Sequence, residues 1–294
     1  MGRSLQARYR QAMNASRRHI PTGTIATIEA FAAGPDAPLV HFAHATGMCA
    51  ALYGRLFDRL APHVNIVASD ARGHGATTLP ADPAALHDWH GYADDLVALL
   101  AALPPPRRLI LAGHSMGATV SLGVASRVGG VAGVVLIEPA FIPFAVAGSW
   151  TRSPLVNPMA AQAARRRAVW PSRAAMADAY RGRGVFASWH ADDLAAYLAG
   201  GVRDRADGEV ELACTPAWEA ATFAAVSHDT AAAVAAWTGP LILLHATERS
   251  TVMPADAATI AERPNARVEC FPGRDHFLPL AEPDAMAAAI LALC

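Results

Sequence analysis

The sequence contains no lysine, and all 24 of its basic residues are arginine. This absence excludes a Schiff-base mechanism, because that chemistry needs a lysine amine. The sequence also has no excess charge of either sign, since 24 basic residues balance 25 acidic ones and the formal net charge is −1. We therefore expect a small-molecule substrate, and neither nucleic acid nor an anionic membrane, as the partner.

Cysteine is scarce. The four cysteines are Cys49, Cys214, Cys270 and Cys294. No two of them form a Cys-x-x-Cys pair, so the sequence predicts neither a zinc site nor a disulfide framework. This pattern fits the reducing environment of the cytoplasm.

Long apolar runs are also missing. The most apolar window, residues 131–148, is interrupted by Glu138 and two prolines, which a membrane-spanning helix would tolerate badly. The first twenty residues are basic but contain no continuous apolar stretch of the signal-peptide type. The sequence therefore predicts a cytoplasmic protein without a transmembrane segment.

Seven short runs rich in β-branched residues or leucine recur along the chain between helical segments. They are TIATIEAF, PLVHFAHA, NIVASD, RLILAGHS, VVLIEP, LILLHA and RVECF. Runs of this length between helical patterns are typical of a mostly parallel sheet whose strands are buried on both faces by helices. The predicted fold class is therefore α/β.

The spacing of these runs is broken once, between VVLIEP and LILLHA. About a hundred residues lie there, where a crossover usually needs only about thirty. The insertion reads as amphipathic helices joined by Gly, Pro and Asp turns, with a polar loop, VRDRADGEV, in the middle. We predict a core of residues 1–139 and 235–294. A helical cap of residues 140–234 follows the sixth strand and covers the carboxyl edge of the sheet, where such sheets bind ligands.

The stretch LAGHSMGAT places Ser115 in a Gly-x-Ser-x-Gly turn between an apolar strand and a helix. Such a turn holds the serine in a strained conformation above the sheet, and Gly113 and Gly117 are needed because the two backbones crowd there. The amino terminus of the helix also favours developing negative charge. Ser115 is therefore the predicted nucleophile. The alternative, a serine that merely caps the helix, would not need the second glycine.

Four motifs together resemble the α/β-hydrolase superfamily, and the resemblance extends from about residue 20 to the end of the chain. Besides the GHSMG turn they are HATG at 44–47, DARGHG at 70–75 and GRDHFLPLAEP at 273–283. The resemblance implies the α/β-hydrolase fold, with a mostly parallel central sheet flanked by helices. It also implies that the insertion after the sixth strand is the lid that capped members carry.

His276 is the predicted general base, because it lies in the loop after the last strand and follows the serine in chain order. Its imidazole would take the Ser115 proton during attack and return it to the leaving group. By match to the family, the oxyanion hole would use the backbone amides of Met116 and Thr46.

The triad acid is where this chain departs from the family's pattern. Members usually place an aspartate after the strand that here reads LILLHA, but Arg249 stands at that position. Glu138, at the end of VVLIEP, is the favoured alternative, because some capped relatives, including certain haloalkane dehalogenases, carry the triad carboxylate there. A glutamate that closes an apolar strand also needs a charge-assisted partner when it is buried. Glu248, next to Arg249, is the second alternative.

Three further histidines, His44, His74 and His114, lie in or beside the motif loops. We interpret them as residues whose hydrogen bonds fix the loops. His44 is also a candidate for the substrate pocket, because it lies in the HATG loop. Asp275, next to the predicted base, is interpreted as a loop-turn residue.

Tryptophans and arginines mark the predicted cap. The four cap tryptophans are Trp150, Trp170, Trp189 and Trp218. Trp150 and Trp189 are predicted to line the substrate pocket, although anchoring of amphipathic helices is the commoner role of tryptophan. The run Arg165 to Arg167 is interpreted as the solvated face of a cap helix, with attraction of an anionic substrate as the alternative.

Together these residues predict a carboxylesterase-like serine hydrolase that acts on a small, apolar substrate through an acyl-enzyme, without metal or organic cofactor. A serine rather than an aspartate at the turn argues against haloalkane dehalogenase or epoxide hydrolase chemistry. Lactonase, thioesterase, amidase and carbon–carbon bond hydrolase activities share the fold and triad and remain alternatives. The competing class is a non-catalytic ligand-binding protein of this fold. No sequence feature indicates an oligomeric state.

Overall fold

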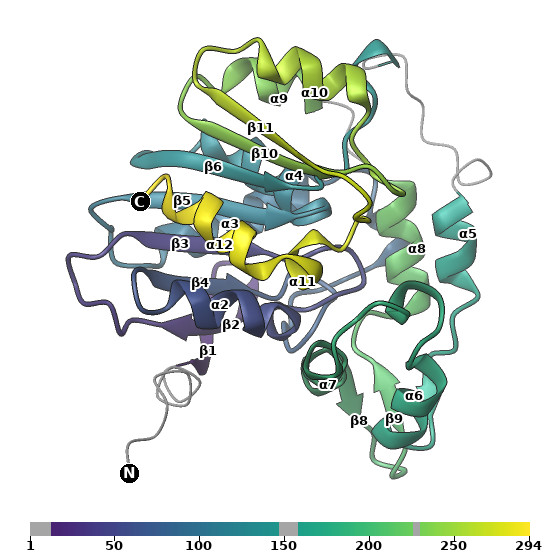
Figure 1. The fold of residues 1–294 in the computed structure, drawn as a ribbon. Helices are drawn as coiled ribbons and strands as arrows, with labels where there is room; N and C mark the ends of the chain where they lie inside the picture. The colour runs from purple at the N-terminus through teal and green to yellow at the C-terminus, as the bar shows by residue number, and fades with distance from the viewer. Residues whose placement is uncertain (1–12, 147–157, 226–229) are drawn as a thin grey trace, which may run out of the picture.

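An eight-stranded sheet forms the centre of the computed structural model, which describes residues 13–146, 158–225 and 230–294 (Figure 1). Its strands are β1 (Asn14–Ile20), β2 (Gly23–Ala30), β3 (Leu39–Ala43), β4 (Asn65–Ser69), β5 (Leu109–His114), β6 (Val131–Ile137), β10 (Leu241–Ala246) and β11 (Ala266–Phe271). The strand order is β1-β2-β4-β3-β5-β6-β10-β11. β2 pairs antiparallel with β1 and β4, and the remaining neighbours are parallel. The predicted α/β class is confirmed, while β1 is a strand that the sequence analysis missed.

Helices cover both faces of this sheet. The helices of one face are α2 (Gly54–Leu60), α11 (Leu278–Ala281) and α12 (Pro283–Leu291), and those of the other are α3 (His90–Ala101), α4 (Met116–Ala125), α9 (Thr230–Ala236) and α10 (Pro254–Ala261). Strand β6 contributes buried side chains to both faces of the sheet. Val135 and Ile137 are buried with α2 and α12, whereas Val134 and Leu136 are buried with α3 and α4. Because successive side chains point to opposite faces, a strand covered twice reads as a continuous apolar run.

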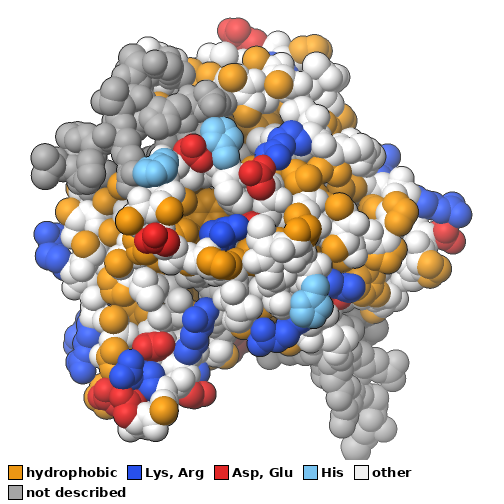
Figure 2. Space-filling view, turned by 180° about the vertical axis from the view of Figure 1, so that it is seen from behind, with side chains coloured by type: hydrophobic (Ala, Val, Ile, Leu, Met, Phe, Trp, Pro, Cys, Tyr) orange, Lys and Arg blue, Asp and Glu red, His pale blue; other side chains and the backbone are white. Residues whose placement is uncertain are grey.

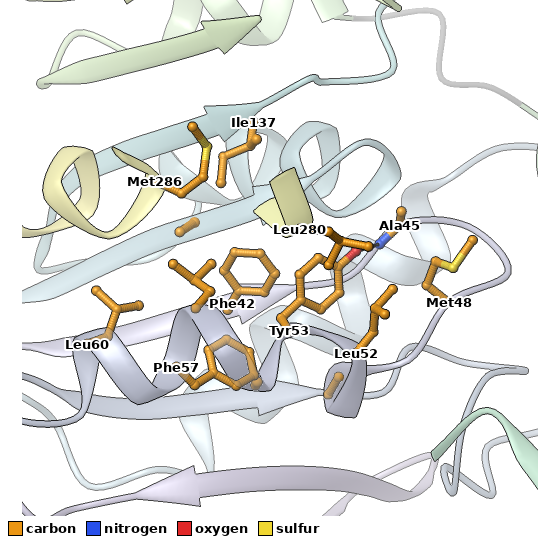
Figure 3. Close-up of a cluster of buried hydrophobic side chains, with 14 of the residues drawn as sticks. Phe42, Ala45, Met48, Leu52, Tyr53, Phe57, Leu60, Ile137, Leu280 and Met286 are labelled. Carbon is orange, nitrogen blue, oxygen red and sulfur yellow. Dashed lines mark hydrogen bonds between the residues drawn. The ribbon is translucent and has the colours of Figure 1, made fainter. Parts of the chain in front are cut away.

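An aromatic cluster supports the loop that follows β3 (Figure 3). Phe42, on β3, packs against Tyr53 and Phe57 with ring centroids 4.7 and 5.4 Å apart, and all three side chains are almost fully buried. The Tyr53 hydroxyl lies at the edge of the apolar cluster. It accepts a hydrogen bond from the backbone N–H of Ala45, at 3.1 Å. The core thereby fixes the backbone directly beyond β3.

The insertion after β6 lies over one end of the sheet. Its described helices are α5 (Pro158–Ala164), α6 (Arg173–Tyr180), α7 (Ala191–Gly200) and α8 (Pro216–Ala224). It also contains a three-stranded sheet, with β9 (Val210–Leu212) between β7 (Val169–Trp170) and β8 (Val202–Asp204). Short 3-10 helices are η1 (Ala50–Tyr53), η2 (Pro83–Ala85), η3 (Phe144–Val146) and η4 (Gly184–Phe186). In Figure 1 the cap lies beside the lower right end of the core.

The prediction of a polar loop for VRDRADGEV is right for the turn at residues 205–209 and wrong for its ends, which belong to β8 and β9 of an antiparallel hairpin. Val202, Val210 and Leu212 are buried, and Arg203 and Glu211 at the positions next to them are not. In the sequence, the charged side chains of the turn obscure the alternation of buried and more exposed residues along these two strands. The predicted cap boundary at residue 234 also falls inside α9, which packs against α4 of the core.

The described surface carries both signs of charge in close proximity. Figure 2 shows acidic and basic side chains near one another, with apolar side chains between them. Exposed ion pairs such as Arg107–Asp36 and Arg127–Asp94 contribute to this mixture. Within the described residues every helix is too short or too polar to cross a membrane.

The junction of β5 and α4 leaves no room for a side chain at its two glycines. A Cβ atom on Gly113 would lie 2.4 Å from the backbone carbonyl carbon of Gly117. A Cβ atom on Gly117 would lie 2.2 Å from the carbonyl oxygen of Ala43, at the end of β3. The turn between the two glycines is therefore packed directly against the neighbouring strand.

We predict that Gly117→Ala destabilises the protein by about 2 kcal/mol or more, because backbone atoms must move to admit the methyl group. Gly123 is the matched control in the same helix, since a Cβ atom there meets nothing within 4 Å. Gly123→Ala is expected to stabilise the protein by up to about 1 kcal/mol. Urea unfolding followed by circular dichroism measures both, and equal midpoints for the two variants would contradict the close approach of α4 to β3.

Candidate active site

The predicted catalytic residues gather at the carboxyl edge of the sheet. Ser115 directly follows β5, Glu138 directly follows β6, and Thr46 lies just beyond β3. His276 lies in the loop between β11 and α11. Carboxyl ends of parallel strands meet at one edge, which is where open α/β sheets bind ligands.

Ser115 has a strained backbone. Its φ of 54° and ψ of −120° are unusual for a residue with a side chain. The residue stands at the N-cap position of α4 but makes no side-chain cap hydrogen bond. The helix-capping alternative is therefore wrong, and the strain is of the kind expected for a nucleophile turn.

Glu138 and His276 are in direct contact. His276 Nδ1 lies 2.9 Å from Glu138 Oε2, and the glutamate is fully buried. The carboxylate also accepts hydrogen bonds from the backbone N–H of Ala246 at 2.6 Å, the Ser250 hydroxyl at 2.7 Å and the backbone N–H of Thr251 at 3.0 Å. A buried carboxylate is tolerated when it has such partners. Three segments, after β6, β10 and β11, are thus tied together at one side chain.

These contacts keep Glu138 ionised. Burial acts to raise the pKa of Glu138, but the hydrogen bond and charge of His276, together with the Ala246 amide and the Ser250 hydroxyl, outweigh it. The resulting pKa is about 2. Because the carboxylate only accepts, it holds the hydrogen of His276 on Nδ1 and leaves Nε2 as the basic nitrogen.

Arg249, at the position of the family's usual aspartate, supports the histidine loop instead. Its guanidinium pairs with Asp275 Oδ2 at 2.7 Å, and Asp275 Oδ1 accepts from the backbone N–H of Phe277 at 3.0 Å. The loop-turn interpretation of Asp275 agrees with these contacts. Arg249 also has a positive φ of 50°.

Glu248 is the other carboxylate considered for the triad. Its side chain is exposed, and within the described residues it makes no hydrogen bond or ion pair. Only its backbone N–H is engaged, by the carbonyl oxygen of Arg274 at 2.9 Å. Of the two carboxylates, Glu138 is the one that contacts His276.

The loop after β3 contains the first amide predicted for the oxyanion hole. The N–H of Ala45 donates to the Tyr53 oxygen, and the N–H of Gly47 donates to His74 Nε2 at 3.0 Å. In the described part of the chain, the N–H of Thr46 between them has no protein acceptor. The loop therefore presents the amide that the family match assigns to the oxyanion hole.

Met116 supplies the second predicted oxyanion donor. It is the first residue of α4, where a backbone N–H has no partner within the helix. A Cβ atom on the next residue, Gly117, would lie 2.2 Å from the carbonyl oxygen of Ala43 and 2.6 Å from that of His44. The start of α4 and the loop that carries Thr46 are therefore adjacent.

A chain of hydrogen bonds joins the Thr46 loop to the histidine loop. His114 Nε2 lies 2.8 Å from the carbonyl oxygen of His276, so this nitrogen carries the hydrogen. His114 Nδ1 then accepts from the Tyr53 hydroxyl at 2.9 Å, and Tyr53 in turn accepts from Ala45. The sequence analysis assigned His114 to loop fixing but missed Tyr53, which no motif marks.

The ring nitrogens of His44 and His74 form hydrogen bonds with backbone groups of the neighbouring loops. His44 Nδ1 donates to the Ala45 carbonyl and His44 Nε2 accepts from the Ala71 N–H. These contacts match the loop-fixing role and leave His44 no polar atom for a substrate, which argues against its pocket assignment. His74 Nδ1 donates likewise to the Arg72 carbonyl. Within the described residues, no group of three or more His, Cys, Asp or Glu is arranged to hold a metal ion.

Two of the three cap tryptophans that the structure describes differ clearly in role. The Trp189 ring packs edge-on against Phe277, with centroids 5.2 Å apart, and so lies next to the His276 loop. Trp218 Nε1 donates to the Arg72 carbonyl, which anchors α8 to the core. Trp150 lies outside the described residues.

The buried histidines generate a prediction for pH. Burial lowers the pKa of His41, His74 and His114 from an ordinary 6.5 to about 3. Between these values the unfolded chain binds more protons than the folded one, so stability is complete above pH 6.5 and falls as the pH drops toward 3. Each histidine contributes a slope of up to about 1.4 kcal/mol per pH unit.

Urea unfolding from about pH 7.5 to pH 5 tests this slope, above the range in which Glu138 titrates. His114→Gln keeps a donor and an acceptor and is expected to reduce the slope by about one proton. His63 is exposed, so His63→Gln is the control that shows whether loss of any imidazole reduces the pH slope of the unfolding free energy. An unchanged slope in His114→Gln would contradict a neutral, buried His114.

Several solved structures have the same fold as this chain. E-2-(acetamidomethylene)succinate hydrolase is 24% identical, with a TM-score of 0.78 over 96% of this chain and 98% of that one. An alpha/beta hydrolase from Novosphingobium aromaticivorans is 19% identical, with a TM-score of 0.76 over 96% and 99% of the two chains. The enol-lactonase from Burkholderia xenovorans is 18% identical, with a TM-score of 0.69 over 95% and 99%.

At these identities the structural likeness shows the fold alone. No curated protein matches the chain in sequence. The model of the alpha/beta hydrolase family matches residues 42–289, a span that contains the GHSMG turn, the insertion after β6 and the His276 loop. The chain therefore belongs to the alpha/beta hydrolase family.

Proposed function

We propose that this protein is a carboxylesterase-like serine hydrolase that cleaves an ester, or a related acyl bond, of a small substrate. The observation that carries the proposal is the 2.9 Å contact between His276 Nδ1 and Glu138 Oε2, at the same sheet edge as the strained Ser115. This contact supports a basic Nε2 on His276 and an ionised Glu138 carboxylate hydrogen-bonded to the opposite ring nitrogen. These are the features that activate a serine hydroxyl.

In the proposed reaction His276 Nε2 takes the proton of Ser115 as the serine oxygen attacks the ester carbonyl carbon. The negative charge that forms on the carbonyl oxygen is stabilised by the N–H groups of Met116 and Thr46. His276 then gives its proton to the departing alcohol, which leaves an acyl group on Ser115. Water, deprotonated by the same nitrogen, attacks the acyl carbon, the bond to Ser115 breaks as His276 returns the proton to the serine oxygen, and the carboxylic acid is released. Throughout, Glu138 stabilises the imidazolium that forms twice in the cycle.

The competing class, a non-catalytic ligand-binding protein, rested on the missing aspartate after β10. The Glu138 contact offers His276 an acid from β6 and so weakens that argument. Lactonase, thioesterase, amidase and carbon–carbon bond hydrolase activities use the same residues and remain alternatives within the proposal. The four cysteines are unpaired, which supports the proposed cytoplasmic location.

The first test is hydrolysis of p-nitrophenyl acetate, butyrate and octanoate by the wild type and Ser115→Ala. We expect the variant to lose at least about a thousandfold in kcat/KM, because no other group forms the acyl-enzyme. Ser126→Ala, at an exposed position at the end of the same helix, is the control and is expected to retain full activity. Equal rates for the wild type and Ser115→Ala would refute ester hydrolysis at this serine.

The second test separates the two carboxylates. Glu138→Gln is expected to lower kcat by about two to four orders of magnitude, because the amide no longer stabilises the imidazolium. Glu248→Gln is expected to stay within about threefold of the wild type, since its side chain is exposed. Thermal unfolding of both variants checks that they fold. The opposite ranking would assign the acid to the loop after β10.

A further inference from the structure

The three consecutive arginines that follow α5 have different environments. Arg165 and Arg167 are exposed, and Arg167 lies over the Trp170 ring. The side chain of Arg166, in contrast, is only 20% exposed. The interpretation of the run as one solvated face is therefore wrong for Arg166, which points into the protein.

Arg166 is held by side chains from three helices of the cap. Its Nη1 pairs with Glu219 of α8. Its Nη2 donates to the hydroxyl oxygen of Tyr197, on α7, at 3.1 Å and to that of Tyr180, on α6, at 3.4 Å. We call Arg166, Glu219, Tyr180 and Tyr197 the Arg166 cluster.

The Arg166 cluster lies against the proposed oxyanion loop. A Cβ atom on Gly47 would be 2.5 Å from Glu219 Oε1 and 3.5 Å from Arg166 Nη1. Gly47 directly follows Thr46, whose N–H is the amide predicted for the oxyanion hole. The Arg166–Glu219 ion pair therefore lies against the residue next to Thr46, with the carboxylate nearer than the guanidinium.

The Arg166 cluster has more donors than acceptors. Both tyrosine oxygens accept from Arg166, so each hydroxyl still has its own hydrogen to donate. Among the described residues neither hydroxyl hydrogen, nor the Nε–H of Arg166, has an acceptor. Trp189 Nε1, in a ring that packs against Tyr197, is likewise buried without a partner. A buried donor without an acceptor, here Trp189 Nε1, is costly, and together with the remaining donors of the cluster it suits a ligand rich in acceptor oxygens.

The charges near the Arg166 cluster favour an anion. Burial acts to lower the pKa of Arg166, but Tyr197 and Glu219 raise it above its usual value, so the guanidinium stays charged. Burial raises the pKa of Glu219, while the charge and hydrogen bond of Arg166 act to lower it. Arg203, whose guanidinium donates to the carbonyl oxygens of Gly75 and Thr77, adds a second positive charge near His74.

Aromatic rings connect the Arg166 cluster with the histidine loop. Tyr180 stacks on Phe186 with centroids 4.2 Å apart, and Phe186 packs against Trp189 at 4.8 Å. Trp189 then contacts Phe277, the residue after His276. The Arg166 cluster and the proposed catalytic base are thus joined by one apolar wall.

We propose that Arg166, together with the hydroxyls of Tyr180 and Tyr197, binds a carboxylate group on the acyl part of the substrate. This inference rests on the proposed function and sharpens it. The ester carbonyl would lie at Thr46 and Met116, the short acyl chain along the aromatic wall, and the carboxylate at Arg166. The substrate class is then the half-esters of short dicarboxylic acids rather than wholly apolar esters.

The test compares p-nitrophenyl hydrogen glutarate with p-nitrophenyl methyl glutarate, which differ only in the free carboxylate. The wild type is expected to prefer the half-ester by at least about tenfold in kcat/KM. The variant is Arg166→Gln combined with Glu219→Gln, because removing the arginine alone would leave a buried carboxylate unpaired. We expect it to lower kcat/KM for the half-ester about 10- to 100-fold, mainly through KM, and to change the methyl ester within about threefold.

Two further sets of variants keep the test specific. Tyr197→Phe and Tyr180→Phe remove one hydroxyl each and are expected to raise KM for the half-ester by about three- to tenfold. Arg165→Gln removes a neighbouring exposed charge and is expected to change neither ester. Equal losses on both esters, or a wild-type preference for the methyl ester, would overturn the carboxylate site while leaving the proposed esterase activity intact.

Binding of glutarate measured by calorimetry tests the site without catalysis. The wild-type protein is expected to bind the dianion at least about tenfold more tightly than the Arg166→Gln/Glu219→Gln variant, with Arg165→Gln unchanged. If neither ester is hydrolysed but glutarate binding shows this difference, the proposed hydrolysis fails and the carboxylate site stands. Absence of glutarate binding to the wild type would overturn the carboxylate site.

Discussion

The candidate site depends on the burial of one carboxylate with a full set of hydrogen-bond donors. Glu138 is inaccessible to solvent, and an unpaired charge there would be strongly destabilising. Its four donor groups come from His276, Ala246, Ser250 and Thr251. The loops after β10 and β11 therefore supply the donors that allow Glu138 to be buried at the end of β6. The contact that orients the imidazole also compensates the burial of the carboxylate.

A second constraint is that several buried histidines stay neutral. His74 Nε2 accepts the Gly47 amide, and His114 Nδ1 accepts the Tyr53 hydroxyl. Protonation of either nitrogen would replace an attraction by a repulsion between hydrogens. Burial lowers the pKa of both rings to about 3, so neither is protonated near neutral pH. The geometry of the proposed oxyanion loop is thus maintained by desolvation as well as by hydrogen bonds.

The insertion after β6 contacts the loop after β3, which carries the proposed oxyanion amide of Thr46, and the loop after β4. Trp218 donates to the Arg72 carbonyl, Arg203 donates to the Gly75 carbonyl, and Glu219 packs against Gly47. Residues that would select the substrate therefore contact the loop that would bind its carbonyl oxygen.

Local patterns in the sequence determined the α/β class, the seven predicted strands and the turn at Ser115, because strand periodicity and turn geometry depend on neighbouring residues. The charged hairpin at VRDRADGEV escaped prediction, since its alternation is visible only once Val210 and Leu212 have a core to face. The sequence favoured Glu138 over Glu248 as the partner of His276 but left both open, and the tertiary structure decided between them by bringing together two residues 138 positions apart along the chain. The tertiary structure also decided that Arg166, and neither of its neighbours, turns inward. Partners so distant in sequence are chosen by packing, and no short pattern encodes them.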